Sequence, residues 1–476
     1  MLLRILPCQP HCLRHVKHRQ DSAFQAVSAC IRLIEQSPHP GLPDHLTRKT
    51  TMPAAAATCS ASADGSIHVD LREVIHALSD ALDLVGIDDV AHGKRVGIMA
   101  FHCAGVLGQP RQQAGFMFDL GLLHDIGVSS TRTHQHLVSE FDWVGSQQHC
   151  ISGAKLLASF APLAAMALPV RYHHTQWDRL QAMQEVPQHI AEQANLIYLV
   201  DRVDALAAPY YQGGELLMHT AAIRQQIAQR RGVHFAPHLV DAFLSAAQAE
   251  AFWLQLEPRG IAGVLQDMCA LRQPCTASTG QLKQLATLFS CIVDAKSPFT
   301  ARHSLGVAGL SRWLAEKMGL PTARCEQLEI AALLHDLGKL RVPDEILDKP
   351  GGLDPHERSL INAHSFETYQ ILRHIHGFEE IACWAAYHHE EPDGNGYPFH
   401  LQAASMSVEA RILRVADIFQ ALAQDRPYRA GLSAAEVLAT LQRFADQQRI
   451  DPAVLALAAS DMAGAMAAAL PELSPQ

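Results

Sequence analysis

The stretch Ile330–Leu340 reads IAALLHDLGKL, and a related stretch, GLLHDIGV, occupies Gly121–Val128. In both, an apolar run with helical character ends in a His-Asp pair, and a glycine, a common helix terminator, follows two residues later. Adjacent side chains on a helix diverge by about 100°. Such a pair cannot face one small ion symmetrically, but its carboxylate can bridge two neighbouring ions. The pattern therefore predicts a helical fold that presents metal ligands at a helix end.

Other histidines and aspartates surround each pair at nearly constant intervals. The first His precedes the His-Asp pair by 32 residues in both copies (335 − 303 and 124 − 92), and a later His precedes a His-His pair by 24 (388 − 364 and 173 − 149). Chance does not preserve such intervals, so the chain contains a duplicated site. The C-terminal set is His303, His335, Asp336, His364, His388, His389 and Asp417. The N-terminal set is His92, His124, Asp125, His149, His173, His174 and Asp201.

The donor atoms indicate the kind of centre. Imidazole and carboxylate ligands suit Fe, Mn, Zn and related ions, and five histidines with two aspartates exceed what one ion needs. We therefore expect two divalent metal ions in the C-terminal set. Metal identity cannot be read from these ligands, because the same set accepts several ions.

Length and composition set the outer bounds. A chain of 476 residues, 48% of them hydrophobic, exceeds what one core usually holds. Aromatic residues are only 6%, and Ala and Leu dominate, which favours helices. The formal net charge of −10 argues against a nucleic-acid polymer as the main partner. Eleven cysteines without a CxxC pair, and no apolar run of about 20 residues, predict a cytoplasmic protein without membrane insertion.

The sequence divides into four segments. Residues 1–65 are rich in Pro, His, Arg and Ser and are expected to be disordered, and the sequence leaves open whether translation begins at Met1 or Met52. Residues 66–257 and 279–476 are expected to form two tandem helical domains, joined by a linker at 258–278. Pro237 and Pro452, which are 215 residues apart (452 − 237), extend the repeat beyond the ligand pattern. Whole domains were therefore duplicated.

The C-terminal half resembles an HD-GYP domain, a branch of the HD phosphohydrolase superfamily, over roughly residues 285–460. The matching segments are LLHDLGKLRVPDEILDKPGGL, HHEEPDGNGYP and ADIFQALAQDRPYR. The resemblance implies an all-α bundle with a di-metal centre that hydrolyses cyclic di-GMP to pGpG or GMP. Fe and Mn are the ions expected from the family.

The resemblance also assigns roles to single residues. One metal would take His303, His335 and Asp417, the other His364, His388 and His389, with Asp336 as the bridge. Lys339 would meet the scissile phosphate, and the further substrate contacts would be Tyr397, Arg426 and Arg429. Some family members bind a third metal through a Glu four residues before the first His. This chain has Phe299 there, so two metals are expected.

The N-terminal copy resembles a plain HD domain. It keeps the ligand positions, but Lys339 corresponds to Val128, the GYP stretch becomes HHTQWDRLQAM, and no equivalent of either arginine remains. Two hypotheses stay open for this half: a retained metal site, for which Asp88 is an additional candidate ligand, or a structural or regulatory domain.

Three functions are compatible with the sequence. The leading hypothesis is a cyclic di-GMP phosphodiesterase, and a homodimer is compatible with the family. The second is the same chemistry on another cyclic dinucleotide or nucleotide. The third is a non-catalytic protein that binds such a ligand, against which the intact ligand set and Lys339 argue.

Overall fold

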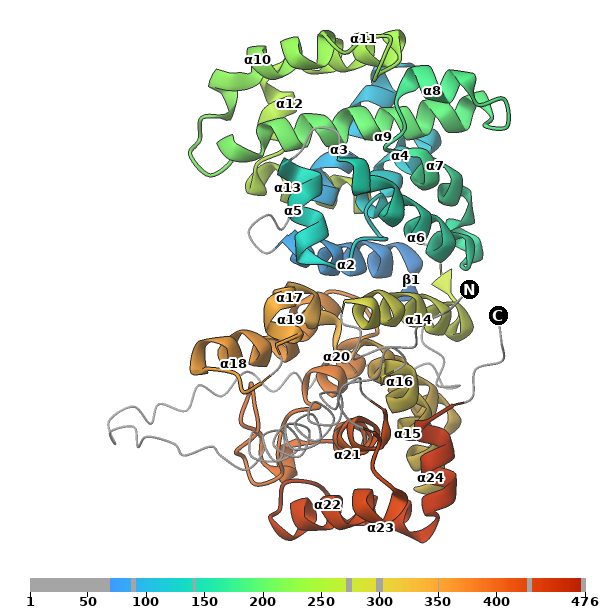
Figure 1. Ribbon diagram of the computed structural model, residues 1–476, viewed down its shortest axis with the longest axis vertical. Coiled ribbons are helices and arrows are strands. Elements are labelled where there is room, and N and C mark those ends of the chain that lie inside the picture. The colour runs from blue at the N-terminus through green and yellow to red at the C-terminus, as the bar shows by residue number, and fades with distance from the viewer. Residues whose placement is uncertain are drawn as a thin grey trace, which may run out of the picture.

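The computed structural model describes residues 69–86, 91–139, 143–270, 276–296, 303–349, 351–425 and 430–471. Within these ranges the chain is almost entirely helical, and the all-α prediction is confirmed. Two stacked groups of helices, one from each half of the chain, form an elongated molecule (Figure 1). The predicted N-terminal segment, Asp88, Phe299, Arg426 and Arg429 lie outside the described residues.

The N-terminal half contains the longest helix of the described chain and a series of shorter ones. Its helices are α2 (Leu71–Asp83), α3 (His92–Val106), α4 (Arg111–Leu123), α5 (Thr131–Ser139), α6 (Gln147–Ala158), α7 (Ala167–Tyr172), α8 (Trp177–Ala182), α9 (Gln188–Ala207), α10 (Leu216–Ala228), α11 (Pro237–Ala246), α12 (Glu250–Leu254) and α13 (Pro258–Ala270). Short 3₁₀ turns connect several of them, among them η1 (Leu84–Gly86) and η3 (Ala161–Met166).

The C-terminal half repeats this order. Its helices are α14 (Thr279–Ala295), α15 (His303–Lys317), α16 (Thr322–Leu334), α17 (Asp344–Leu347), α18 (Pro355–Asn362), α19 (His364–Leu372), α20 (Glu379–Ala386), α21 (Val408–Ala423), α22 (Ala434–Asp446), α23 (Pro452–Ser460) and α24 (Met462–Ala469). The 3₁₀ turn η5 (Leu337–Arg341) follows α16 directly.

Equivalent helices in the two halves start and stop on equivalent residues. Helices α3 and α15 both begin at the first His of their ligand set and run for 15 residues. Helices α4 and α16 are both 13 residues long, begin after a proline and end one residue before the His of the His-Asp pair. Helices α11 and α23 both begin with the matched prolines. Proline lacks a backbone N–H, and at the first position of a helix that group would have no partner within the helix.

One glycine in each half lets two ligand-bearing segments approach closely. Gly338 lies two residues after the His-Asp pair, and a Cβ there would collide with the carbonyl oxygen of His364. Gly127 stands in the same relation to the carbonyl oxygen of His149. In both halves only glycine allows the turn after the His-Asp pair to rest against the helix that carries the next His.

The halves meet through their first helices and the turns that follow the His-Asp pairs. Strands β1 (Val69–Asp70) and β2 (Thr276–Ala277), which precede α2 and α14, pair antiparallel with each other. Asp344 at the start of α17 accepts hydrogen bonds from Ser130 Oγ (2.7 Å) and from the backbone N–H of Thr131 (3.2 Å). Lys296 Nζ lies 3.2 Å from Asp344 Oδ1. The carboxylate therefore caps α5 from the other half of the chain.

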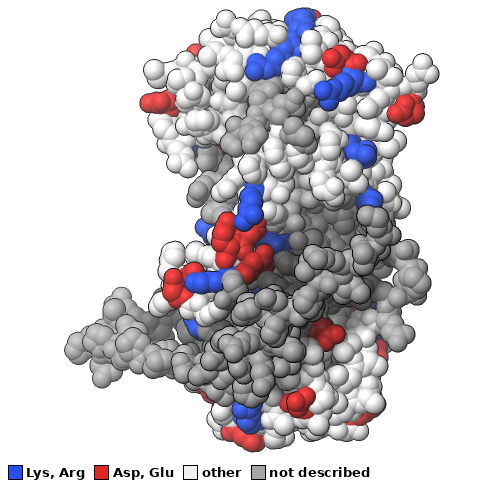
Figure 2. Space-filling model, in the orientation of Figure 1, with Lys and Arg blue, Asp and Glu red and all other residues white. Residues whose placement is uncertain are grey.

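The surface and the helix lengths give two further facts. Acidic and basic side chains are interspersed on the described part of the face in Figure 2. No single helix among the described residues is long and apolar enough to cross a membrane. Helices α23 and α24 reach the required length and composition only together, and they bend by 100° where they join.

Candidate metal centres

The seven predicted C-terminal ligands converge in one buried cluster at the centre of their helices. His303 begins α15, His335 and Asp336 follow α16, and His364 begins α19. His388 and His389 follow α20, and Asp417 lies in the middle of α21. Donor atoms of His303, His335 and Asp417 lie within 4.8 Å of one another, and so do those of His364, His388 and His389.

Asp336 stands between these two groups and turns one oxygen to each. Its Oδ2 lies 3.3 Å from His335 Nε2 and 3.7 Å from His303 Nε2. Its Oδ1 lies 3.4 Å from His364 Nε2 and 3.8 Å from His388 Nε2. The carboxylate thus has the geometry of a bridge between two ion positions.

The ring nitrogens that face the cluster carry lone pairs. The Nδ1 of His335, His364 and His388 each lies 2.6–2.7 Å from the backbone carbonyl three residues earlier, which can only accept a proton. Nδ1 therefore donates, and in a neutral ring Nε2 is left as an acceptor. Burial lowers the pKa of His364 to about 4 and that of His388 well below its usual value, so both rings are neutral near pH 7.

Two of these Nε2 atoms face each other, and neither carries a proton. His364 Nε2 and His388 Nε2 are 3.1 Å apart. Among the described residues, His335 Nε2 and Asp336 Oδ1 are buried without a hydrogen-bond partner. Buried acceptors in such a position are costly unless a cation fills the space between them. The donor set therefore fits divalent metal ions.

Of the predicted substrate residues, the structure describes Lys339 and Tyr397, and both lie at the edge of this cluster. Lys339 Nζ donates to Asp336 Oδ2 at 2.6 Å, and its side chain is 23% exposed. Tyr397 stacks on the ring of His389 with centroids 4.8 Å apart. Gly396 is required beside it, since a Cβ there would collide with the backbone of Glu390 and Glu391.

Sequence reasoning missed several residues that hold the ligands in place. Gln420 Oε1 lies 2.6 Å from His303 Nδ1 and fixes that ring. The buried Arg414 donates to Glu391 at 2.5 Å and to the carbonyl oxygen of His388 at 3.4 Å. Arg414 and Gln420 lie three residues before and after Asp417, which places them on its side of α21. That spacing is the signal by which they could have been found.

The N-terminal ligands converge in the same way. Asp125 Oδ2 lies 3.6 Å from His124 Nε2 and 3.8 Å from His92 Nε2, and its Oδ1 lies 3.3 Å from His149 Nε2 and 3.7 Å from His173 Nε2. Donor atoms of Asp125, His149, His173 and His174 form one group, and those of His92, His124 and Asp125 another. Both halves thus contain buried His/Asp clusters that suit metal ions.

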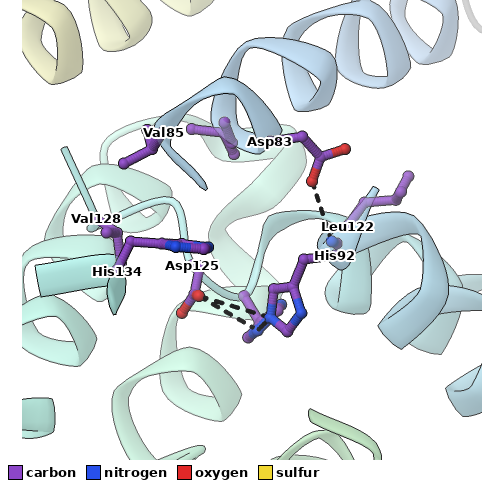
Figure 3. Close-up of a pocket in the computed structure, with 10 residues that line it drawn as sticks. Asp83, Val85, His92, Leu122, Asp125, Val128 and His134 are labelled. Carbon is purple, nitrogen blue, oxygen red and sulfur yellow. Dashed lines mark hydrogen bonds and ion pairs between the residues drawn. The ribbon is translucent and has the colours of Figure 1, made fainter. Parts of the chain in front are cut away.

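The surroundings of the N-terminal cluster differ from those of its counterpart. A small pocket beside His92 and Asp125 is lined by Val85, Val128 and His134 (Figure 3), so apolar side chains stand where Lys339 stands in the other half. Asp201 is paired with the buried Arg202 at 2.9 Å, whereas the residue after Asp417 is Ile418.

The environment of His92 also differs from that of His303. His92 Nδ1 lies 2.8 Å from Asp204, which in turn is paired with Arg95. In the C-terminal half the corresponding partner of the histidine is the neutral Gln420.

Comparisons with known proteins identify a family and several similar proteins. A family model described as "HD domain" matches residues 286–454. The chain is 36% identical over 397 residues to 3'3'-cGAMP-specific phosphodiesterase 1 of Vibrio cholerae, which covers 81% of this chain and 90% of that protein. It is 38% identical over 143 residues to a cyclic di-GMP phosphodiesterase of Pseudomonas aeruginosa, covering 29% of this chain and 34% of that protein.

A solved structure covers both halves. The crystal structure of a cyclic GMP-AMP specific phosphodiesterase of V. cholerae is similar with a TM-score of 0.56 and 26% identity, over 86% of this chain and 99% of that one. The similarity therefore includes the N-terminal half, which the family model does not reach.

Proposed function

Because this chain belongs to the HD-domain family of phosphohydrolases, we propose that it is a cyclic dinucleotide phosphodiesterase whose preferred substrate is 3'3'-cyclic GMP-AMP. The observation that carries the proposal is the 36% identity to a 3'3'-cGAMP-specific enzyme over both halves of the chain. The GYP stretch by itself favoured cyclic di-GMP, but two relatives with that activity cover only 29% and 31% of this chain. The second sequence hypothesis, the same chemistry on another cyclic dinucleotide, is thus better supported than the first.

We place the reaction at the C-terminal cluster. Two bound divalent ions would polarise the scissile phosphodiester and stabilise the attacking and leaving oxygens of an in-line displacement. His303, His335 and Asp417 would hold one ion, and His364, His388 and His389 the other. Asp336 would fix their separation through its two oxygens, whose distances to the two groups are nearly equal.

Lys339 and Tyr397 would complete the site. Lys339 is a partly exposed cation at the edge of the cluster, so its ammonium can exchange its contact with Asp336 for a phosphate oxygen of the substrate. Tyr397 covers His389 and keeps water away from that side of the ring. Arg426 and Arg429 remain the proposed contacts to phosphate and purine.

A substrate panel tests the proposal. The full chain, loaded anaerobically with Fe(II) or Mn(II), would be assayed for kcat/KM on 3'3'-cyclic GMP-AMP, cyclic di-GMP and cyclic di-AMP. We expect the mixed dinucleotide to be preferred by at least about tenfold, which equals about 1.4 kcal/mol of transition-state discrimination. An equal or greater kcat/KM for cyclic di-GMP would instead support the first hypothesis, a cyclic di-GMP phosphodiesterase. Binding without turnover of any of the three would leave a ligand-binding protein.

A further inference from the structure

A thiol lies inside the N-terminal cluster, where the C-terminal cluster has a hydroxyl. Cys150 follows His149 as Ser365 follows His364. Cys150 is fully buried, and its Sγ lies 3.7 Å from His149 Nε2, a nitrogen that faces the cluster. Ser365 Oγ lies 3.3 Å from His364 Nε2 in the other half. At this position the N-terminal cluster therefore has a soft sulfur donor, whereas the C-terminal cluster has a harder oxygen donor.

The four printed distances among these donor atoms are close to those of a tetrahedral ion. With bonds of about 2.0–2.1 Å to N or O and about 2.3 Å to S, the ligand atoms of a tetrahedral zinc lie about 3.3–3.6 Å apart. His149 Nε2 lies 3.2 Å from His173 Nε2, 3.3 Å from Asp125 Oδ1 and 3.7 Å from Cys150 Sγ. Asp125 Oδ1 lies 3.7 Å from His173 Nε2 and has no hydrogen-bond partner.

The other side of the N-terminal cluster is unfavourable for a second ion. The guanidinium of Arg202 is buried against Asp201, with Nη2 and Nε at 2.9 and 3.2 Å from its Oδ2. Asp201 is thus already neutralised by a fixed cation, which would repel a metal ion beside it. The C-terminal half has no charge at that place, because Ile418 occupies it.

We propose that the N-terminal half binds a single Zn²⁺ through the thiolate of Cys150 together with Asp125, His149 and His173. Thiolate ligands favour zinc over the harder ions that imidazole and carboxylate alone accept. His174 lies in one donor group with Asp125, His149 and His173 and is a further nitrogen donor beside the ion. A site without an open position holds structure and performs no hydrolysis. The duplication has therefore produced two unlike metal centres, and this inference does not depend on the substrate of the other half.

Cobalt substitution tests the thiolate directly. The full chain would be loaded with Co(II), and the thiolate-to-cobalt charge-transfer band in the near ultraviolet would be titrated. We expect the band to saturate at one cobalt thiolate per chain. Cys150→Ser, which installs the residue that the C-terminal half already has, should abolish the band, and Cys103→Ser, the same change at a buried cysteine elsewhere, should retain it. Ser365→Cys in the Cys150→Ser background should restore a band from the other centre.

Zinc-edge X-ray absorption provides a readout that needs no variant. The wild-type chain loaded with zinc should show sulfur ligation at about 2.3 Å that amounts to one sulfur per chain. This experiment decides the question if Cys150→Ser fails to fold. A folded, metal-loaded wild-type chain without sulfur ligation, or a cobalt band that survives in Cys150→Ser, would overturn the proposal.

Discussion

At the residue scale, the two copies show how much a repeated pattern can reveal. The intervals between His and Asp predicted two sets of candidate ligands. The structure brings thirteen of these fourteen side chains into donor groups that could hold a metal ion, and the fourteenth, Asp201, is paired with Arg202. What the intervals could not reveal is which neighbours matter. Cys291 is exposed on α14, whereas Cys150 is buried inside a cluster. Burial depends on tertiary packing, and a single cysteine belongs to no repeated interval from which its position could be predicted.

The first prediction separates the two polar residues that touch each other at the C-terminal centre. Asp336→Ala removes the carboxylate that faces both groups of histidines, so it should lower metal content and reduce turnover to background. Lys339→Ala should leave both ions in place and lower kcat by about 10²–10³-fold, because it removes a charge that acts on the transition state. Elemental analysis and steady-state kinetics on the two variants measure both effects. Equal metal loss in the two variants would refute this division of roles.

At the element scale, the helices were predictable and their mutual positions were not. Prolines before α4 and α16, and at the first positions of α11 and α23, set boundaries that a sequence can give. The approach of the His-Asp turn to the next ligand helix depends on a missing Cβ at Gly338, and that follows only from the folded chain. The pairing of Arg414 with Glu391, which connects α21 to the His388–His389 turn, is likewise a tertiary contact.

The second prediction concerns this connection. Arg414→Met keeps the length of the side chain but leaves Glu391 without one of its two arginine partners, so the His388–His389 turn should loosen. We expect metal affinity of the C-terminal centre to fall about 10–100-fold, as is usual when a partner that orients ligands is lost. Competition with a chelating dye measures it. Arg411→Met, one turn away on α21 and paired with Asp451, serves as the control, and an equal loss there would speak against a specific positioning role.

At the scale of the whole molecule, the two duplicated halves pack against each other. Equivalent strands β1 and β2 pair with each other, and the turn after one His-Asp pair meets the turn after the other. The sequence predicted two copies, but it could not predict that they would join through these turns, because the contact is made by Asp344 and Ser130, which occupy different places in the repeat. Each His/Asp cluster is thus close in sequence to the junction.

The third prediction tests the junction through pH. Burial alone would raise the pKa of Asp344, but the hydrogen bond from Ser130 and the charge of Lys296 outweigh it and lower that pKa. A carboxyl group with a lowered pKa stabilises the fold above its unfolded value, about 3.9, and loses this contribution as the pH falls through the folded value. Asp344→Asn should therefore cost about 1–3 kcal/mol at pH 7 and less near pH 3. Calorimetric Tm values at the two pH values measure the difference.

A matched substitution gives this experiment its control. Glu345 lies beside Asp344 on α17 and is exposed, so Glu345→Gln should leave Tm nearly unchanged at both pH values. A Tm difference for Asp344→Asn that stays constant from pH 7 to pH 3 would show that the carboxylate charge does not hold the junction.

The most direct test of the account is one chromatographic measurement on three proteins. Wild-type chain, Asp336→Ala and Asp125→Ala would be loaded anaerobically with Fe(II) or Mn(II), incubated with 3'3'-cyclic GMP-AMP, and their products resolved. We expect a linear dinucleotide from the wild type and, largely undiminished, from Asp125→Ala, and none from Asp336→Ala. No product from the folded, metal-loaded wild type, or product that disappears in Asp125→Ala and persists in Asp336→Ala, would contradict the assignment of catalysis to the C-terminal centre.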